Sequence, residues 1–185
     1  MIRLFVALPL PHDIRLRLAT LASGIPGARW VPPENFHLTL RFIGEVPQST
    51  AADIHDMLMG IRAPGFDLWL NGVDHFGPLR KARNLWVGAQ RDAALQHIHD
   101  KIESAVVRAG LPRETRKFVP HVTLARIRGE TGHHLANFLA ANSLFRAGPI
   151  EIDRFVLYAS HMGREGSVYE ELAEYYLSLP AVAVA

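Results

Sequence analysis

A four-residue pattern, His-x-Thr-Leu, occurs twice in this chain, as His37-Leu38-Thr39-Leu40 and again as His121-Val122-Thr123-Leu124. Each copy lies inside an apolar run of the kind that forms β-strands. Alternate residues of a strand point to the same face, so each copy turns a histidine and a threonine to one side and buries its apolar residues on the other. The repeat therefore predicts two strands that offer imidazole and hydroxyl groups to a polar cleft.

The two copies divide the chain into similar halves. Each half contains strands, helices and one motif strand, and His121 lies 84 positions after His37 in a chain of 185 residues. No linker rich in proline, serine or glycine separates the halves. We therefore expect one bilobal domain over residues 1–185 of the α+β class. It should have a pseudo-twofold arrangement of two antiparallel sheets, with outer helices and a central cleft that carries two His-x-Thr-x motifs.

Hydrophobic periodicity locates the individual elements. The clearest helix covers residues 92–109, where Leu95, Ile98 and Ile102 recur on one face and Gly110 stands at the C-terminal end. We expect strands at residues 2–9, 36–43, 66–73, 85–90, 121–127, 152–160 and 168–179, and helices at residues 11–23, 50–61, 92–109 and 134–141.

Arginine dominates the basic residues of the chain. Lysine and arginine together number 20, and the lysines are Lys81, Lys101 and Lys117, which leaves 17 arginines. The planar guanidinium group suits phosphate recognition, whereas a net charge of +2 is far below that of a protein that coats duplex nucleic acid. We therefore expect a small phosphorylated ligand or a nucleic-acid end as the partner.

Cysteine is absent from the sequence, which excludes disulfides, a thiolate nucleophile and a cysteine-based zinc site. No apolar run approaches the roughly 18 residues that a membrane helix needs. The apolar start is interrupted at Pro9, too early for a signal peptide. We expect a cytoplasmic, monomeric protein with no membrane contact.

Two histidines that face one cleft suit general acid–base catalysis near neutral pH. With an unperturbed pKa of about 6.5, one ring can be protonated while the other is neutral. The neighbouring threonine hydroxyls can hydrogen-bond phosphoryl oxygens without adding charge. These groups suit in-line cleavage of a phosphodiester, in which one histidine deprotonates water and the other protonates the leaving oxygen. The alternative, that both histidines make ordinary structural hydrogen bonds, is weakened by their shared four-residue context.

Longer segments carry a resemblance to a known family. Residues 30–46 (WVPPENFHLTLRFIGEV) and 118–126 (FVPHVTLAR) resemble the two motif blocks of the two-histidine (2H) phosphoesterases. Within that superfamily they are most similar to the RNA 2′,3′-cyclic phosphodiesterases, historically called 2′-5′ RNA ligases. Residues 3–8 resemble the opening strand of that family. Residues 157–160, followed by a glycine-rich turn and Tyr169, resemble its closing hairpin.

The resemblance implies a metal-independent, cofactor-free reaction that opens 2′,3′-cyclic phosphates at the ends of RNA or nucleotides to 2′-phosphates. It implies that His37 donates a proton to the leaving 3′ oxygen and that His121 is the base that activates water. Thr39 and Thr123 would hold the phosphate oxygens, and Arg126 is a further candidate for phosphate binding. RNA joining through a 2′-5′ linkage and RNA-end binding without turnover remain as alternatives.

Strict strand alternation sends two further candidates away from the cleft. Arg126 falls on the face opposite the motif histidine, and it reaches the cleft only if the strand bends there. Phe42 has the same alternation and is expected in the core, although an aromatic ring at the cleft mouth could stack a base. His161 is a candidate for the cleft edge, and the basic turn at residues 80–83 is a candidate for attracting an RNA terminus.

Two histidine pairs outside the motifs raise the question of a metal site. His97 and His99 are two residues apart on a predicted helix, and such positions do not face each other. His133 and His134 are adjacent at the start of another predicted helix. We therefore expect no metal site in this chain.

Overall fold

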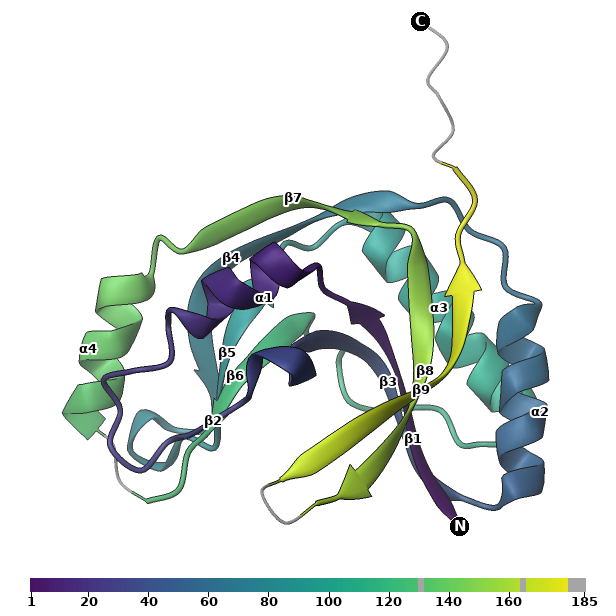
Figure 1. Cartoon of the computed structure of the whole chain (residues 1–185), viewed down its shortest axis with the longest axis horizontal. Coiled ribbons are helices and arrows are strands. Elements are labelled where there is room, and N and C mark those ends of the chain that lie inside the picture. The colour runs from purple at the N-terminus through teal and green to yellow at the C-terminus, as the bar shows by residue number, and fades with distance from the viewer. Residues whose placement is uncertain (130–131, 164–165, 180–185) are drawn as a thin grey trace, which may run out of the picture.

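A computed structural model describes residues 1–129, 132–163 and 166–179 of the chain (Figure 1). The strands form one arched antiparallel sheet, with α4 at one end of the arch and α2 and α3 at the other. The elements, with η for a 3-10 helix, are β1 (Ile2–Pro9), α1 (His12–Ala19), β2 (Arg29–Trp30), η1 (Pro33–Asn35), β3 (His37–Val46), α2 (Gln48–Met59), β4 (Phe66–Phe76), η2 (Leu79–Lys81), β5 (Asn84–Ala89), α3 (Ala93–Arg108), β6 (His121–Arg126), α4 (Gly132–Asn142), β7 (Arg146–Ile152), β8 (Arg154–Met162) and β9 (Ser167–Tyr176).

The two motif strands lie side by side in the middle of the sheet. The strand order is β7-β4-β5-β6-β3-β1-β8-β9, and β2 pairs with β6 outside this row. Counted outward from the centre, β6 corresponds to β3, β5 to β1, β4 to β8 and β7 to β9. The α+β class and the pseudo-twofold arrangement are thus confirmed. The two expected sheets are joined into one, because β3 and β6 pair antiparallel through Leu38 and Val122.

One hydrophobic core extends through both halves of the sheet. The helix α3 buries Leu95, Ile98 and Ile102 in this core, as its periodicity predicts. Asp92 caps its N-terminus by accepting hydrogen bonds from two backbone N–H groups. Gly110 follows its C-terminus with a φ of +95°, a conformation that glycine adopts without strain.

The strand β7 is missing from the elements expected on sequence grounds. Gly148 and Pro149 lie in its middle, and these two residues usually interrupt strands. β7 is an edge strand that pairs with β4 alone, so the missing N–H of Pro149 breaks no ladder on its other side. A Cβ at Gly148 would lie 2.8 Å from the Trp69 ring, and this close packing accounts for the glycine.

Four elements end three or four residues away from the end that the periodicity predicts, among them β9, which ends at Tyr176 rather than at residue 179. β3 continues to Val46 because it stays paired with β1 over that whole length. β4 likewise continues to Phe76 beside β5. α1 ends at Ala19 rather than near residue 23, because the next residues make the tighter hydrogen bonds of turns.

Candidate active site

A cavity of about 250 Å³ lies over the two motif strands, on the face of the sheet that carries the motif histidines. His37 and Thr39 of β3 line it together with His121 and Thr123 of β6. Because the strands run antiparallel about their central pair, the register sets each histidine across from the threonine of the other strand. In a regular antiparallel ladder, diagonal neighbours such as the two histidines are about 7–8 Å apart. The structure therefore brings the four motif side chains to one cavity.

Each motif histidine is anchored by the backbone of its own strand entry. Nδ1 of His37 lies 2.7 Å from the carbonyl oxygen of Asn35, and Nδ1 of His121 lies 2.6 Å from that of Val119. A carbonyl only accepts, so Nδ1 carries the hydrogen in both rings. This arrangement leaves Nε2 of each neutral ring as the nitrogen that can accept a proton.

The two rings are packed in matching ways. His37 stands edge to face against Tyr169, with ring centroids 5.2 Å apart and an interplanar angle of 86°. His121 stands in the same way against Phe76, at 5.0 Å and 83°. Phe5 and Trp86 complete the aromatic surroundings of the two rings. The imidazoles are therefore oriented by one backbone hydrogen bond each and by aromatic neighbours, which for His37 also include Tyr158.

Burial makes both histidines weaker bases than a histidine in water. Burial is the largest effect on His37, and its pKa falls to about 4 although the hydrogen bond to Asn35 opposes the change. The nearby charge of His121 lowers the pKa of His37 further. Burial also lowers the pKa of His121, against the effect of its bond to Val119. Both rings are consequently neutral at pH 7 in the free protein, and a bound anion would favour protonation.

A β-bulge occurs at the same position in both motif strands. Leu40 has no register partner in β1, and Leu124 has none in β5. Two successive residues are buried at each bulge: Leu40 and Arg41 in β3, and Leu124 and Ala125 in β6. The extra residue reverses the alternation, so that Phe42 and Arg126 turn back to the side of the histidines. Both line the cavity.

The bulges overturn the expectation for Phe42 and place Arg126, whose position the sequence left open. Phe42, expected in the core, is 41% exposed and lines the cavity, with the Arg3 guanidinium 5.1 Å from its ring centroid. Arg126 reaches the cavity, because its strand has the bend that the expectation required. Sequence reasoning misses Arg3 and Asn84, which line the cavity from the neighbouring strands β1 and β5. No motif marks these two residues in the sequence, and only their place in the sheet identifies them. Asn84, for example, is the register partner of Arg126.

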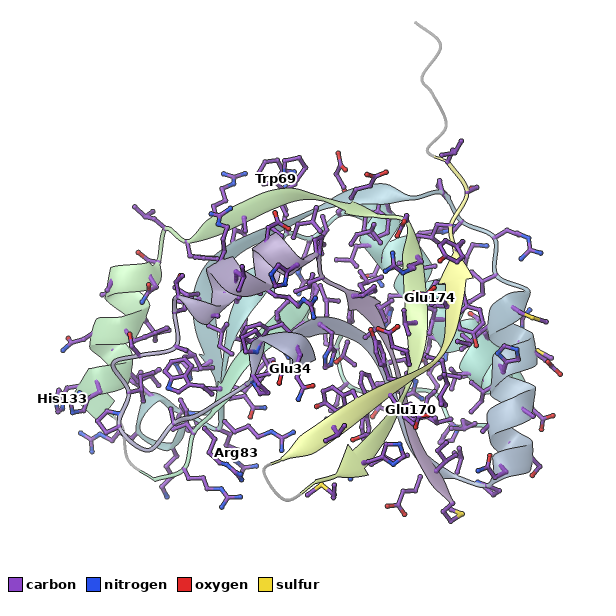
Figure 2. The ribbon with its side chains drawn as sticks, viewed as in Figure 1. Glu34, Trp69, Arg83, His133, Glu170 and Glu174 are labelled. Atoms are coloured by element: carbon purple, nitrogen blue, oxygen red, sulfur yellow. The ribbon has the colours of Figure 1, made fainter. Side chains whose placement is uncertain are left out.

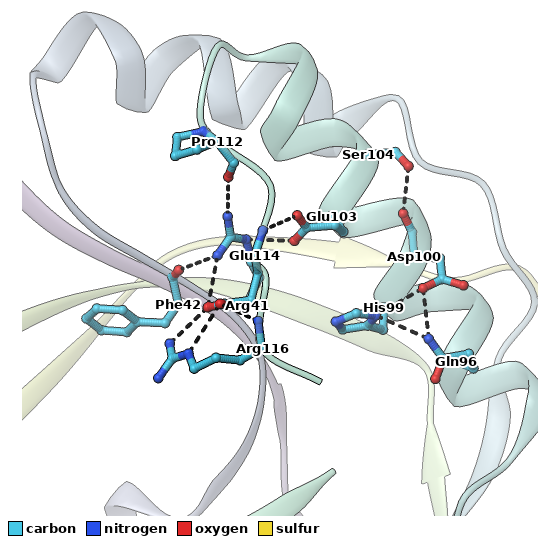
Figure 3. A network of polar contacts seen from close by, with 10 residues as sticks. All are labelled: Arg41, Phe42, Gln96, His99, Asp100, Glu103, Ser104, Pro112, Glu114 and Arg116. Carbon is cyan, nitrogen blue, oxygen red and sulfur yellow. Dashed lines mark hydrogen bonds and ion pairs between the residues drawn. The ribbon is translucent and has the colours of Figure 1, made fainter. Parts of the chain in front are cut away.

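A buried ion pair connects β3 to α3 and, through further hydrogen bonds, to the segment that precedes β6 (Figure 3). The bulge turns Arg41 away from the cavity, where its Nε lies 2.7 Å from Glu103 of α3. Arg41 also donates through Nη2 to the carbonyl of Pro112, and Glu103 accepts from the backbone N–H of Glu114. These contacts tie β3 to the segment that ends in the carbonyl of Val119, the anchor of His121.

The other candidates lie outside the cavity. His161 is exposed on β8, and its Nε2 lies 2.9 Å from Glu170, which is labelled on the hairpin in Figure 2. The basic turn at residues 80–83 contributes nothing to the lining of the cavity. His99 stacks on Phe118, with ring centroids 3.9 Å apart. Within the described ranges, no three or more His, Asp or Glu side chains gather as metal ligands.

The paired strands and histidines define a two-histidine phosphoesterase architecture, and comparison with known proteins agrees. A family model described as LigT like Phosphoesterase matches the chain twice, over residues 8–86 and 87–169. The chain belongs to this family, which confirms the resemblance to the 2H phosphoesterases. Because the model matches each half in turn, it also supports the internal repeat.

Several relatives extend the similarity over most of the chain. A protein of Aeropyrum pernix named RNA 2′,3′-cyclic phosphodiesterase is 37% identical over 162 residues, which cover 86% of this chain and 92% of that protein. A protein of Bacillus subtilis with the same name is 29% identical over 182 residues, or 94% and 96% of the two chains. The crystal structure of E. coli LigT complexed with 3′-AMP has a TM-score of 0.78 at 31% identity, covering 95% and 98%.

The helices also bear on membrane association. In the parts of the chain that the structure describes, no helix combines the length and the apolar character needed to cross a membrane.

Proposed function

We propose that this protein hydrolyses 2′,3′-cyclic phosphate ends of RNA or nucleotides to 2′-phosphates, with His37 and His121 as its catalytic residues. The observation that carries the proposal is the matched anchoring of the two rings. Each donates Nδ1–H to a carbonyl two residues earlier and keeps Nε2 for chemistry at the shared cavity. Relatives that cover most of the chain are named for this activity.

The proposed reaction needs one proton acceptor and one proton donor. A water oxygen attacks phosphorus in line with the P–O3′ bond, which breaks as the new P–O bond forms. Nε2 of His121 accepts the proton of the water, and protonated His37 gives its Nε2 proton to the departing O3′. The two histidines thereby exchange protonation states, and proton exchange with solvent restores them. The anionic substrate favours the protonated form of His37 that the free protein lacks at neutral pH.

The remaining lining residues bind the phosphate in this proposal. The hydroxyls of Thr39 and Thr123 donate hydrogen bonds to its non-bridging oxygens, where charge accumulates in the transition state. In the free protein Oγ1 of Thr39 lies 3.1 Å from Nε2 of His37, close to the reacting groups. Arg126 supplies a positive charge at the cavity edge.

A hydrolysis assay with matched histidine variants tests the proposal. The substrate is a 2′,3′-cyclic mononucleotide, and EDTA is present because the reaction is proposed to need no metal. We expect His37→Ala and His121→Ala each to lose at least about 10²-fold in kcat, as general acid–base residues do. His161→Ala is the control, since this exposed ring lies outside the cavity. Turnover near the wild-type rate in both motif variants would falsify the proposal, as would loss of activity in EDTA.

The same residues permit a second displacement, in which the 5′-hydroxyl of another RNA replaces water as the attacking group, O3′ leaves and a 2′-5′ linkage forms. Incubation with one RNA bearing a cyclic phosphate and another bearing a 5′-hydroxyl distinguishes the reactions by product. We expect the 2′-phosphate, because water is far more concentrated than an RNA end. A joined product would assign ligation instead, and tight binding without any product would assign an RNA-end binding module.

We also propose that residues 1–185 act as one bilobal domain and as a monomer in the cytoplasm, where RNA ends are accessible. The cavity is lined from β1, β3, β5, β6, β8 and β9 of a single chain. Both halves are therefore needed to form the site, and a second copy is not. Sedimentation analysis checks the oligomeric state.

A further inference from the structure

A second, larger depression continues from the cavity. This groove has a volume of about 830 Å³ and runs between the segment of residues 29–35 and the strand β9. It shares Asn35, Arg126 and Tyr169 with the cavity, so the two spaces are continuous. The side-chain amide of Asn35 donates to the carbonyl of Ser167 at 2.9 Å, which fixes the two walls to each other.

The size of the cavity explains why a polynucleotide needs this groove. Sites for drug-sized ligands measure about 300–1,000 Å³, and the cavity, at about 250 Å³, lies below that range. It suits a cyclic phosphate and its ribose. In an RNA with a cyclic phosphate at its 3′ end, the chain continues from the 5′ oxygen of the terminal nucleotide and has to leave the cavity. The groove, at about 830 Å³, offers the volume of a further nucleotide.

The positive charge of the groove comes from two neighbouring strands. Arg126 of β6 lines both spaces and so stands at their junction, and Arg29 of β2, its register partner, lines the groove beside it. Among the described residues, no carboxylate lies within 4 Å of either group. Among the lining residues that the structure describes, Glu34 is the acidic one, and Figure 2 places it on the same open side of the arch as Arg83. Arginines without a carboxylate partner at this junction suit a phosphodiester.

The groove also offers surfaces for bases. Tyr169 of β9 lines it, and Trp30 of β2 lines it with a side chain that also packs against the core. Trp30 is braced from behind by Phe138 of α4, with ring centroids 5.9 Å apart. Stacking of bases on such rings requires no particular sequence.

We propose that this groove is a second nucleotide subsite, in which Arg29 binds the phosphodiester that precedes the terminal nucleotide of an RNA. The inference rests on the proposed function, since the terminal cyclic phosphate defines which nucleotide comes next. It makes RNA oligonucleotides, rather than cyclic mononucleotides, the preferred substrates. Arg29 contributes to that preference and not to the chemical step.

The experiment compares two substrates that end in the same cyclic nucleotide and differ in whether they carry further nucleotides that reach the groove. One is a 2′,3′-cyclic mononucleotide, and the other is a trinucleotide that ends in the same cyclic nucleotide. We expect the wild-type protein to have the higher kcat/KM for the trinucleotide. Arg29→Ala lowers that value roughly three- to tenfold, the loss of one charged contact, and leaves the mononucleotide value unchanged. Arg126→Ala lowers both values, because Arg126 lines both spaces.

Two matched variants and a salt series control for general charge effects. Arg108→Ala removes the same charge from an exposed position on α3 that lines neither space, and it leaves both values unchanged. Glu34→Gln removes the acidic group of the groove and raises the trinucleotide value. For each phosphate contact, the logarithm of affinity for single strands falls by about 0.7 per decade of salt. Arg29→Ala therefore makes the salt slope shallower by about that amount.

The outcomes separate this inference from the function on which it rests. Equal kcat/KM for the two substrates, or an Arg29→Ala variant identical to wild type on the trinucleotide, overturns the subsite and leaves the proposed function intact. If the protein hydrolyses neither substrate, the proposed function is wrong, and the proposed subsite is wrong with it.

Discussion

At the scale of single residues, the hydrogen bond from Nδ1 to a backbone carbonyl determines what each motif histidine can do. It selects the tautomer, orients the ring and slightly strengthens it as a base. Burial acts in the opposite direction and is the larger effect, so the pKa of each histidine lies below its ordinary value. The balance between these effects leads to two predictions.

The first prediction concerns the pH dependence of hydrolysis. A reaction that needs one protonated and one neutral histidine has a bell-shaped profile, with its maximum between the two pKa values. Both pKa values of the free protein lie below 6.5, so kcat/KM should peak at a pH below 6.5. The bound phosphate anion raises both pKa values, so kcat should peak at a higher pH. Rates measured from pH 4 to 9 check this, and a kcat/KM maximum above pH 7 contradicts it.

The second prediction concerns stability in acid. In the unfolded chain His37 takes up a proton below about pH 6.5, whereas in the folded protein its pKa is about 4. Between these values the unfolded state binds more protons, so the free energy of unfolding falls as the pH decreases from 6.5 to 4. His37→Gln removes this contribution and should reduce the slope by at most about 1.4 kcal/mol per pH unit. Urea unfolding at several pH values measures the slope, and an unchanged slope refutes the assignment.

At the scale of elements, the bulges determine which side chains meet the substrate. Alternation correctly predicts the facing of each motif histidine and threonine, because both precede the bulge. It fails at Phe42 and Arg126, which follow the bulge. A single extra residue that pairs with nothing has no signature in hydrophobic periodicity, since leucine suits a regular strand equally well. The strand β7 is missed for a related reason: Gly148 and Pro149 usually interrupt strands, and neither the edge position that tolerates the proline nor the Trp69 ring that requires the glycine is visible in the sequence.

The third prediction concerns the ion pair behind β3. Arg41→Met leaves Glu103 buried beside an apolar side chain, which typically destabilises a protein by about 3–5 kcal/mol. Arg41→Met combined with Glu103→Met removes both charges and should cost less than the single change. Urea unfolding of the single and double variants measures the two free energies. If the double variant is less stable than Arg41→Met, then the charge of Glu103 is satisfied by the backbone of Glu114 alone.

At the scale of the whole molecule, the halves of the chain are not the halves of the sheet. The first half of the chain supplies β1 and β3 to one side and β4 and β5 to the other, and the second half adds β6 and β7 beside β4 and β5 and then β8 and β9 beside β1. The repeat of the motif predicts the pseudo-twofold arrangement. It does not predict that each half of the chain supplies strands to both sides of the sheet. That outcome depends on which strands β4 and β8 pair with. A core shared by all these strands follows from this arrangement.

The fourth prediction is that both sides of the sheet unfold together. The chain contains probes for each side: its three tryptophans lie on β2, β4 and β5, and its four tyrosines lie on β8 and β9. Tryptophan fluorescence and tyrosine absorbance should therefore give the same urea midpoint. Leu38→Ala, at the fully buried pair that joins β3 to β6, should lower both midpoints equally, by about 2–5 kcal/mol in stability. Separate midpoints in either protein would mean that the two sides are independent units, and the cavity between them could then not hold both histidines at a fixed spacing.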